Sequence, residues 1–466
     1  VGPSKLVLAL ALAVAAPLPL TDEAVRSEVD RLIASIASAR HLTYHGTLPV
    51  RVLDRAEAAR QAARLDDEAA ADPAAAPEAE LLRRLGIPSP PRDTDEADEE
   101  LVGGDATSSG EATAAPRFDA VTGRLWVPGW ISLDAQQVAL THAVAHAVAD
   151  QRFSFRRLMD IASDGRSRLG GDARRARLAV VEGDAMLTGL ELLDRRETFL
   201  AAPQLNALAA RLRAAAQDPA GGWTATLSTF THVTGLLFVA RARTHRPWNV
   251  VDALWTDPPS STEQVLHPEK YESCEAPVAV DPSALPALPG LGRPSTTDVA
   301  GELVARAWLA TAWAPDVAAR GAAGWGGDRA ALYGLPPENG GADAGAPPTA
   351  ALAWLTLWDD PAEADDFAHA ARAVLERQAE KGISEPATEA TRPDGVVFSS
   401  AKGLFGLARR ADAVALLIAA PEGAEPALQA MLDAVRRAEP TRKAASRPRP
   451  AALPGCLRRD RAGGSE

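Results

Sequence analysis

The chain has 466 residues and a formal net charge of −13, and hydrophobic residues make up 46% of it. This length allows two or three domains, and the apolar share is enough for a sizeable core. The acidic balance argues against nucleic acid as a general partner. Alanine supplies much of the apolar content and favours helices, so we expect a predominantly helical α+β protein.

The N-terminus has the pattern of an export signal. Lys5 precedes an apolar run from Leu6 to Ala16, and the small residues at positions 13–15 offer a cleavage site. The run is too short for a membrane span, and no later segment reaches that length. We therefore predict a signal peptide over residues 1–16 and an exported protein (periplasmic, cell-envelope or secreted) with no integral membrane span after its removal. A buried or frayed N-terminal helix is the alternative.

The next segments predict helices, a strand and an insertion. Two helical patterns fill residues 22–66, and "HLTYHGTLPVRVL" between them is β-branched near its end, which predicts a strand. Residues 88–117 are acidic and rich in Pro, Gly and Ser, which predicts a disordered insertion. A strand is expected at 124–127. Ser132 can then cap a helix that runs to Phe153.

The second half predicts a second α+β segment. A long helix is expected from Asp172 to Arg195, and the Pro- and Gly-rich residues 276–298 predict a linker between a domain over 22–275 and a C-terminal segment over 299–438. In the latter we expect helices at 300–313 and 362–378 and short strands at 353–358 and 412–420. Residues 439–466 predict a disordered basic tail. Cys274 and Cys456 allow one disulfide, and their pairing is left open.

Two histidines and one glutamate stand out chemically. His142 and His146 are four residues apart, so on a helix both imidazoles lie on one face. Such pairs are more often surface or core residues than ligands. Glu182, however, interrupts an otherwise apolar face of the second helix, where a buried carboxylate needs a metal ion or one of the arginines between residues 174 and 177. Two histidines, one carboxylate and an open fourth position form the ligand set of a catalytic zinc site.

The surrounding motifs resemble a family of secreted or membrane-anchored bacterial zincin-like metallopeptidases. "ALTHAVAHAVADQRFSF" resembles the family's helix AHE-x-x-HALQDQ-x-F-x-L, and "AVVEGDA" its third-ligand element. "FDAVTGRLWV" looks like the preceding strand, and "PPSSTEQVLHPEKY" like the P-x-STEQ-x-LHPxKY loop. "AAGWGGDRAALY" and "WLTLWDDPAEADDF" resemble the C-terminal signatures. The resemblance spans roughly residues 40 to 370, with six motifs in the right order.

This resemblance implies a zincin-like scaffold with a small sheet, and it implies roles for individual residues. His142, His146 and Glu182 match the metal ligands, and the implied metal is zinc. Asp150 matches the aspartate of the family's "DQ", and Asp184 that of "EGDA". Both are candidates for groups that orient the metal-binding side chains by hydrogen bonds.

Other matched residues have less defined roles. His267 and Tyr271, in the "HPEKY" loop, could reach a bound carbonyl and are the candidate catalytic side chains. Asp328 and Arg329 of "GWGGDR" look more like a structural ion pair. The tryptophans of the C-terminal signatures (Trp325, Trp354 and Trp358) look more like core residues than ligand-stacking ones.

The chain departs from the family at Ala143. In zincins a glutamate at this place takes a proton from the zinc-bound water, a contribution of about 10² to 10⁴ in rate. Alanine cannot do this. We therefore expect a pseudo-peptidase that keeps the zinc site but binds a peptide or protein. An active zinc metallopeptidase with a substitute base and a metal-free structural protein of the envelope remain the alternatives.

Overall fold

A computed structural model of the chain describes residues 20–61, 64, 75–88, 115–162, 166–193, 202–215, 222–335, 350–381, 387–392 and 394–445. The predicted signal peptide, residues 89–114 of the predicted insertion and residues 446–466 of the predicted tail lie outside these described residues, as does Cys456. Within the described part, the protein is α+β, as the sequence predicts, and its strands form two separate sheets.

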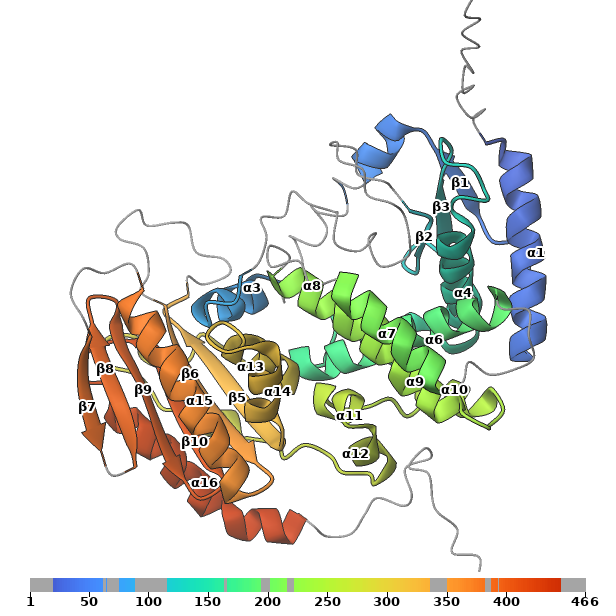
Figure 1. The fold of residues 1–466 in the computed structure, drawn as a ribbon. Coiled ribbons are helices and arrows are strands. Elements are labelled where there is room, and N and C mark those ends of the chain that lie inside the picture. Colours follow the sequence, from blue (N-terminus) through green and yellow to red (C-terminus); the bar gives the residue numbers. More distant parts are fainter. Residues whose placement is uncertain are drawn as a thin grey trace, which may run out of the picture.

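The first part of the chain is mainly helical and includes a small sheet (Figure 1). Its helices are α1 (Asp22–Arg40), α3 (Ala75–Arg84), α4 (Gln137–Phe153), α5 (Phe155–Leu158), α6 (Gly171–Leu193), α7 (Ala202–Ala215), α8 (Gly222–Ser228), the π-helix η2 (Thr229–Thr234), α9 (Gly235–Arg243), α10 (Asn249–Leu254), α11 (Thr262–Leu266) and α12 (Pro268–Glu272). Its strands are β1 (Val50–Leu53), β2 (Arg117–Asp119) and β3 (Arg124–Pro128), in the order β1-β3-β2, with β1 parallel and β2 antiparallel to β3.

Most of the elements predicted here are confirmed, but α4 begins later than expected. The helix starts at Gln137, after a turn over residues 133–136. The Ser132 hydroxyl accepts a hydrogen bond from the Ala135 N–H at 3.3 Å, so it caps this turn and not the helix. The Gln136 side chain is buried and donates to the carbonyls of Pro128 and Ile131, which fixes the turn against the end of β3.

The C-terminal part is built on a seven-stranded, fully antiparallel sheet of order β4-β5-β6-β10-β9-β8-β7. Its strands are β4 (Thr296–Asp298), β5 (Trp325–Tyr333), β6 (Ala351–Trp358), β7 (Thr388–Arg392), β8 (Gly395–Ser400), β9 (Gly403–Arg410) and β10 (Ala413–Ala420). Its helices are the 3-10 helix η3 (Pro282–Ala284), α13 (Gly301–Leu309), α14 (Pro315–Ala322), α15 (Pro361–Glu380) and α16 (Pro426–Ala445). The two strands predicted at 353–358 and 412–420 are β6 and β10, the centre of this sheet.

Both faces of this sheet are covered (Figure 1). Successive side chains of a strand point to opposite faces, and along β6 Leu352 and Trp354 pack with α13 and α15, whereas Ala353 and Leu355 pack with α16. β6 is therefore buried along its whole length. Trp325, Trp354 and Trp358 are all buried, as predicted.

Two segments predicted as irregular are partly built into this unit. Within residues 276–298, Val280, Leu285 and Leu288 are buried under the sheet, and the last three residues form the edge strand β4. α16 continues to Ala445, so residues 439–445 of the predicted tail are helical.

The prediction of an ion pair between Asp328 and Arg329 is wrong. The two carboxylate oxygens of Asp328 accept hydrogen bonds from the backbone N–H groups of Ala300 at 2.8 Å and Gly301 at 2.7 Å. Asp328 therefore provides hydrogen-bond partners for N–H groups at the start of α13, which have none within the helix. The Arg329 Nε instead donates to the Val280 carbonyl.

A buried chain of hydrogen bonds fixes the start of α6 to the sheet unit. The Asp172 carboxylate accepts from the Thr262 N–H at 3.2 Å and from the Thr262 hydroxyl at 2.6 Å. The Thr262 oxygen accepts in turn from the Leu303 N–H at 3.2 Å. Because Asp172 and Thr262 are almost fully buried, this chain joins α6, α11 and α13 without help from solvent.

The buried carboxyl group of Asp172 makes the stability of the protein depend on pH. Burial raises its pKa from an ordinary 3.8 to about 7, against the opposing charge of Arg175. The folded state then binds more protons than the unfolded state between these values, so the free energy of unfolding falls as pH rises through the interval.

We expect Asp172→Asn to remove this dependence, because an amide does not titrate. The stability of the wild type relative to Asp172→Asn should fall between pH 4 and pH 7, by about 1.4 kcal/mol for each unit of pKa shift. Urea unfolding of both proteins at several pH values measures this difference. Parallel stability curves would show that Asp172 is ionised in the folded protein.

Candidate metal centre

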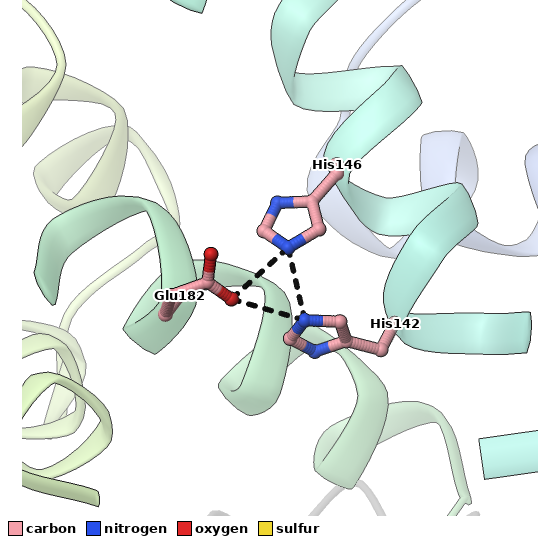
Figure 2. A group of neighbouring side chains, drawn as sticks. All are labelled: His142, His146 and Glu182. Atoms are coloured by element: carbon pink, nitrogen blue, oxygen red, sulfur yellow. Dashed lines mark hydrogen bonds and ion pairs between the residues drawn. The ribbon is translucent and has the colours of Figure 1, made fainter. Parts of the chain in front are cut away.

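The three predicted ligands meet between α4 and α6. His142 and His146 lie one turn apart on α4, and Glu182 points toward them from the middle of α6 (Figure 2). The two Nε2 atoms are 2.9 Å apart, and the Glu182 Oε2 is 3.1 Å from the Nε2 of His142 and 3.2 Å from that of His146. The structure thus brings together residues that are 36 and 40 positions apart in sequence.

The spacing of these atoms suits a small divalent cation. A tetrahedral ion with bonds of about 2.0–2.1 Å keeps its ligand atoms about 3.3 Å apart, close to the three distances observed. Three protein ligands also leave a fourth position open. Imidazole nitrogens and a carboxylate oxygen are the donors that zinc accepts, although other transition metals bind the same set.

One feature departs from common metal sites. A ligating histidine usually donates its second ring N–H to a carbonyl or carboxylate, which fixes the ring. The Nδ1 of His142 is buried but has no hydrogen-bond partner among the described residues. The ring is therefore positioned by packing and by its contacts with His146 and Glu182.

The charges of the cluster are strongly coupled. Burial, together with the charge of His146, lowers the pKa of His142 to about 4. Burial also disfavours the charged form of His146, but the adjacent Glu182 outweighs it and raises the pKa of His146. Burial alone would raise the pKa of Glu182, but the charge of His146 and the hydrogen bonds to His142 and His146 lower it well below its ordinary value. Without a metal, these shifts favour an ionised Glu182 and the protonated form of His146, whereas His142 is neutral at neutral pH.

A backbone-to-backbone contact positions Glu182. The neighbouring Gly183 of α6 lies against Gly235, the first residue of α9, so closely that a Cβ on Gly183 would be 2.3 Å from the Gly235 carbonyl oxygen. In the same way, a Cβ on Gly235 would be 2.2 Å from the carbonyl oxygen of Ala179. Only glycine at both positions allows this approach, which sets α6 at its distance from η2 and α9.

The close packing of α6 against η2 brings a third histidine, His232, to Glu182, and the sequence alone did not reveal it. The His232 Nε2, on η2, is 3.3 Å from the Glu182 Oε2, and its ring stacks near that of His142 at a centroid distance of 6.0 Å. In the sequence this residue is a single histidine in "TFTHVTGLLF", within a pattern that predicts a helix and no site. Only the position of η2 against α6 reveals it.

The two aspartates predicted to support the ligands have other partners. Asp184 accepts hydrogen bonds from Arg40 at 2.6 Å and from the Trp255 indole at 2.8 Å, and Asp150 accepts from the Phe155 N–H at 2.6 Å. Among the described contacts, neither carboxylate forms a hydrogen bond with an imidazole. Both act on the centre through their negative charge, which contributes to the raised pKa of His146.

The candidate catalytic residues are also engaged elsewhere. The His267 Nε2 lies 3.0 Å from the Glu302 Oε1 and 3.1 Å from Arg306, within a separate ionic cluster. The Tyr271 hydroxyl donates to the Asp257 carbonyl at 2.7 Å. In the part of the chain that the structure describes, no hydrogen bond or ion pair joins either residue to the metal-centre residues.

A second acidic group lies near the start of α15 and already has its cation. Glu263, Glu275 and Asp359 have carboxylate oxygens at metal-binding spacing. The Lys270 ammonium group contacts all three, at 2.6 Å from Glu263 and 2.9 Å from Glu275. This lysine supplies the positive charge that a metal would otherwise bring, so the cluster is a structural one.

Comparison with known proteins bears on the C-terminal part alone. Residues 289–435 match a family described as "Domain of unknown function (DUF8575)". The match extends from just before β4 into α16 and includes none of the metal-centre residues. No curated protein and no solved structure matches the chain. The match therefore coincides with the C-terminal part that is built on the seven-stranded sheet, and it assigns no activity to this part.

The glycine contact can be tested by adding one methyl group. We expect Gly183→Ala to lower stability by about 1–3 kcal/mol, because the new Cβ overlaps the Gly235 carbonyl and forces α6 and α9 apart. Gly189→Ala is the matched control on the same helix, since a Cβ added there would meet no other atom within 4 Å. It should raise stability by about 0.5–1 kcal/mol. Thermal or urea unfolding measures both, and equal effects would contradict the proposed role of Gly183.

Proposed function

We propose that this chain is an exported zincin-like protein that binds zinc through His142, His146 and Glu182 and binds a peptide or protein without efficiently cleaving it. The observation that carries the proposal is the triangle of three donor atoms, 2.9–3.2 Å apart, at the predicted ligand positions. Three convergent donors of this kind repel one another unless protons or a cation lie between them. A bound zinc ion would act as a Lewis acid at its open position.

The base required for efficient peptide hydrolysis is missing. Ala143 is 2% exposed and packs in the core formed with α1 and the small sheet. Asp150 and Asp184, two carboxylates that could serve as a substitute base, form hydrogen bonds to other groups. These contacts weigh against an active peptidase that relies on either of them, and they favour a binding role for the site.

A metal-free structural role is the second candidate. It is supported by the ion pairs of Glu182 with the surrounding imidazoles, which can satisfy this carboxylate without a metal.

Export rests on the predicted signal segment, which lies outside the described residues. No helix in the described part of the chain has the length and apolar character needed to cross a membrane.

Elemental analysis separates the two candidates. We expect the purified protein to hold about one zinc ion per chain and His142→Ala to lose it, because two donors bind zinc far more weakly than three. His267→Ala is the matched control, a histidine removed from a different ionic cluster, and it should retain the metal. A wild-type protein that contains no metal and takes up none would leave the structural role.

A second experiment tests the missing base. In the zinc-loaded protein, Ala143→Glu should cleave casein or a peptide library at least about 10² times faster than the wild type, whereas Ala143→Gln, of equal size, should not. Both substitutions crowd a buried position, so their melting temperatures should fall together. A wild type that already cleaves as fast as Ala143→Glu would reveal an active peptidase.

A further inference from the structure

A cavity lies where the helical part of the chain meets the large sheet. Its volume is about 410 Å³, and its walls come from α3, α5 and the residues after it, the start of α6, β4 and β5. Cavities of a few hundred Å³ between packed units are where small molecules commonly bind. Arg174 of α6 belongs to the wall and lies about 12 Å along the helix from Glu182. The cavity is therefore separate from the metal centre.

Much of the cavity wall is apolar. Leu81 of α3, Leu332 of β5 and Met159 line the cavity and are almost fully buried, and the half-buried Phe155 and Ile161 extend the same surface. Moving a hydrocarbon group from water onto such a surface is favourable, by roughly 25 cal/mol for each Å² of apolar area buried. The wall therefore favours a ligand that carries an apolar side chain.

The start of α6 gives one end of the cavity a positive charge. The Glu78 carboxylate accepts hydrogen bonds from the Arg174 Nη2 at 2.5 Å and from the Arg175 Nη1 at 2.6 Å, so two guanidinium groups share one negative charge. Among the hydrogen bonds of the described residues, Arg174 uses only this Nη2, which leaves its Nε and Nη1 for a ligand. A guanidinium group with N–H donors at a cavity wall suits a carboxylate.

A negative charge borders the same cavity at the end of β4. The Asp298 Oδ1 accepts hydrogen bonds from the N–H groups of Gly171 at 2.9 Å and Val299 at 2.8 Å, whereas its Oδ2 has only a longer contact of 3.2 Å with the Gly171 N–H. Oδ2 can therefore accept a further hydrogen bond. Gly171 places no side chain here: an added Cβ would be 2.7 Å from this Oδ2 and 3.0 Å from the Arg175 Nη1. The guanidinium groups and the Asp298 carboxylate are thus close neighbours.

We propose that this cavity binds a zwitterion with an apolar side chain, either a free amino acid such as leucine or a short apolar peptide. Arg174 binds its carboxylate, Asp298 accepts hydrogen bonds from its ammonium group, and the apolar wall receives its side chain. A simple anion would be repelled by Asp298 and a simple cation by the two guanidinium groups, so a molecule with both charges fits best. This second site goes beyond the proposed function and requires no metal.

Calorimetric titration of the full-length protein tests each contact with a matched ligand. Leucine and leucyl-leucine are the two zwitterions, leucinamide lacks the carboxylate, and N-acetylleucine lacks the ammonium group. We expect leucinamide and N-acetylleucine to bind about tenfold more weakly than the tighter zwitterion, because each leaves one charge of the cavity without its partner. Whichever zwitterion binds more tightly identifies a free amino acid or a peptide as the ligand. These measurements need no substitution, so they do not depend on the folding of a variant.

Two substitutions assign the contacts to residues. Arg174→Gln should weaken binding of the tighter zwitterion about tenfold and leave the affinity for leucinamide unchanged. Asp298→Asn should likewise weaken the zwitterion and leave the affinity for N-acetylleucine unchanged. Arg84→Gln is the matched control, because Arg84 is buried to a similar degree and also pairs with a glutamate, but it does not line the cavity. It should bind all four ligands as the wild type does.

The outcomes separate this inference from the zinc proposal. A wild type that binds neither leucine nor leucyl-leucine at millimolar concentration refutes the site. Equal affinity for leucine, leucinamide and N-acetylleucine would show an apolar cavity that does not recognise charge, and this would overturn the proposal as well. If Arg174→Gln binds the zwitterion as tightly as the wild type does, Arg174 does not hold the carboxylate. A protein that binds the zwitterion but no zinc supports this site and refutes the metal centre alone.

Discussion

The contact between Gly183 and Gly235 sets the geometry on which the rest of the centre depends. Helices packed through larger side chains keep their axes about 8–10 Å apart, whereas two glycines let the backbones touch. Here the carbonyl of one helix fills the space that a Cβ of the other would need. Glu182, one residue before this contact, lies within reach of His232 on η2 and of both histidines on α4. Small residues at the crossing thus bring side chains from three helices to one point.

The electrostatics of that point follow from its partial burial. The Glu182 side chain is 21% exposed, and its Oε2 lies within 3.3 Å of three imidazole nitrogens. An ionised carboxylate removed from water needs positive charge nearby, and protonated imidazoles or a metal ion can each supply it. Protonation gives one positive charge per ring and competes with the mutual repulsion of the rings. A divalent ion satisfies the carboxylate and both α4 nitrogens at once, which is the physical argument for a metal.

Sequence reasoning located the elements whose patterns are local. The spacing of His142 and His146, a lone glutamate on an apolar helix face and the resemblance of the surrounding motifs together predicted three side chains within reach of one another. His232 could not be found in this way, because its position beside Glu182 depends on a π-turn and on the backbone contact of Gly235. The large sheet was missed for a related reason: β5 and β9 contain glycines that interrupt alternation, and β7 is exposed along its length, so only β6 and β10 have the continuous apolar run of a buried strand.

The sheet unit supports the centre although it contributes no ligand to it. The hydrophobic core that includes Ala176 and Val180 of α6 continues through Val304 of α13 to Trp354 of the sheet. The buried bonds from Asp172 through Thr262 fix the first turn of α6 to this unit. Glu182 follows ten residues later, about 15 Å further along the same helix. Because a helix packed along its length moves as a rigid body, the position of this carboxylate is set both by the glycine contact at its side and by the C-terminal unit at the helix start.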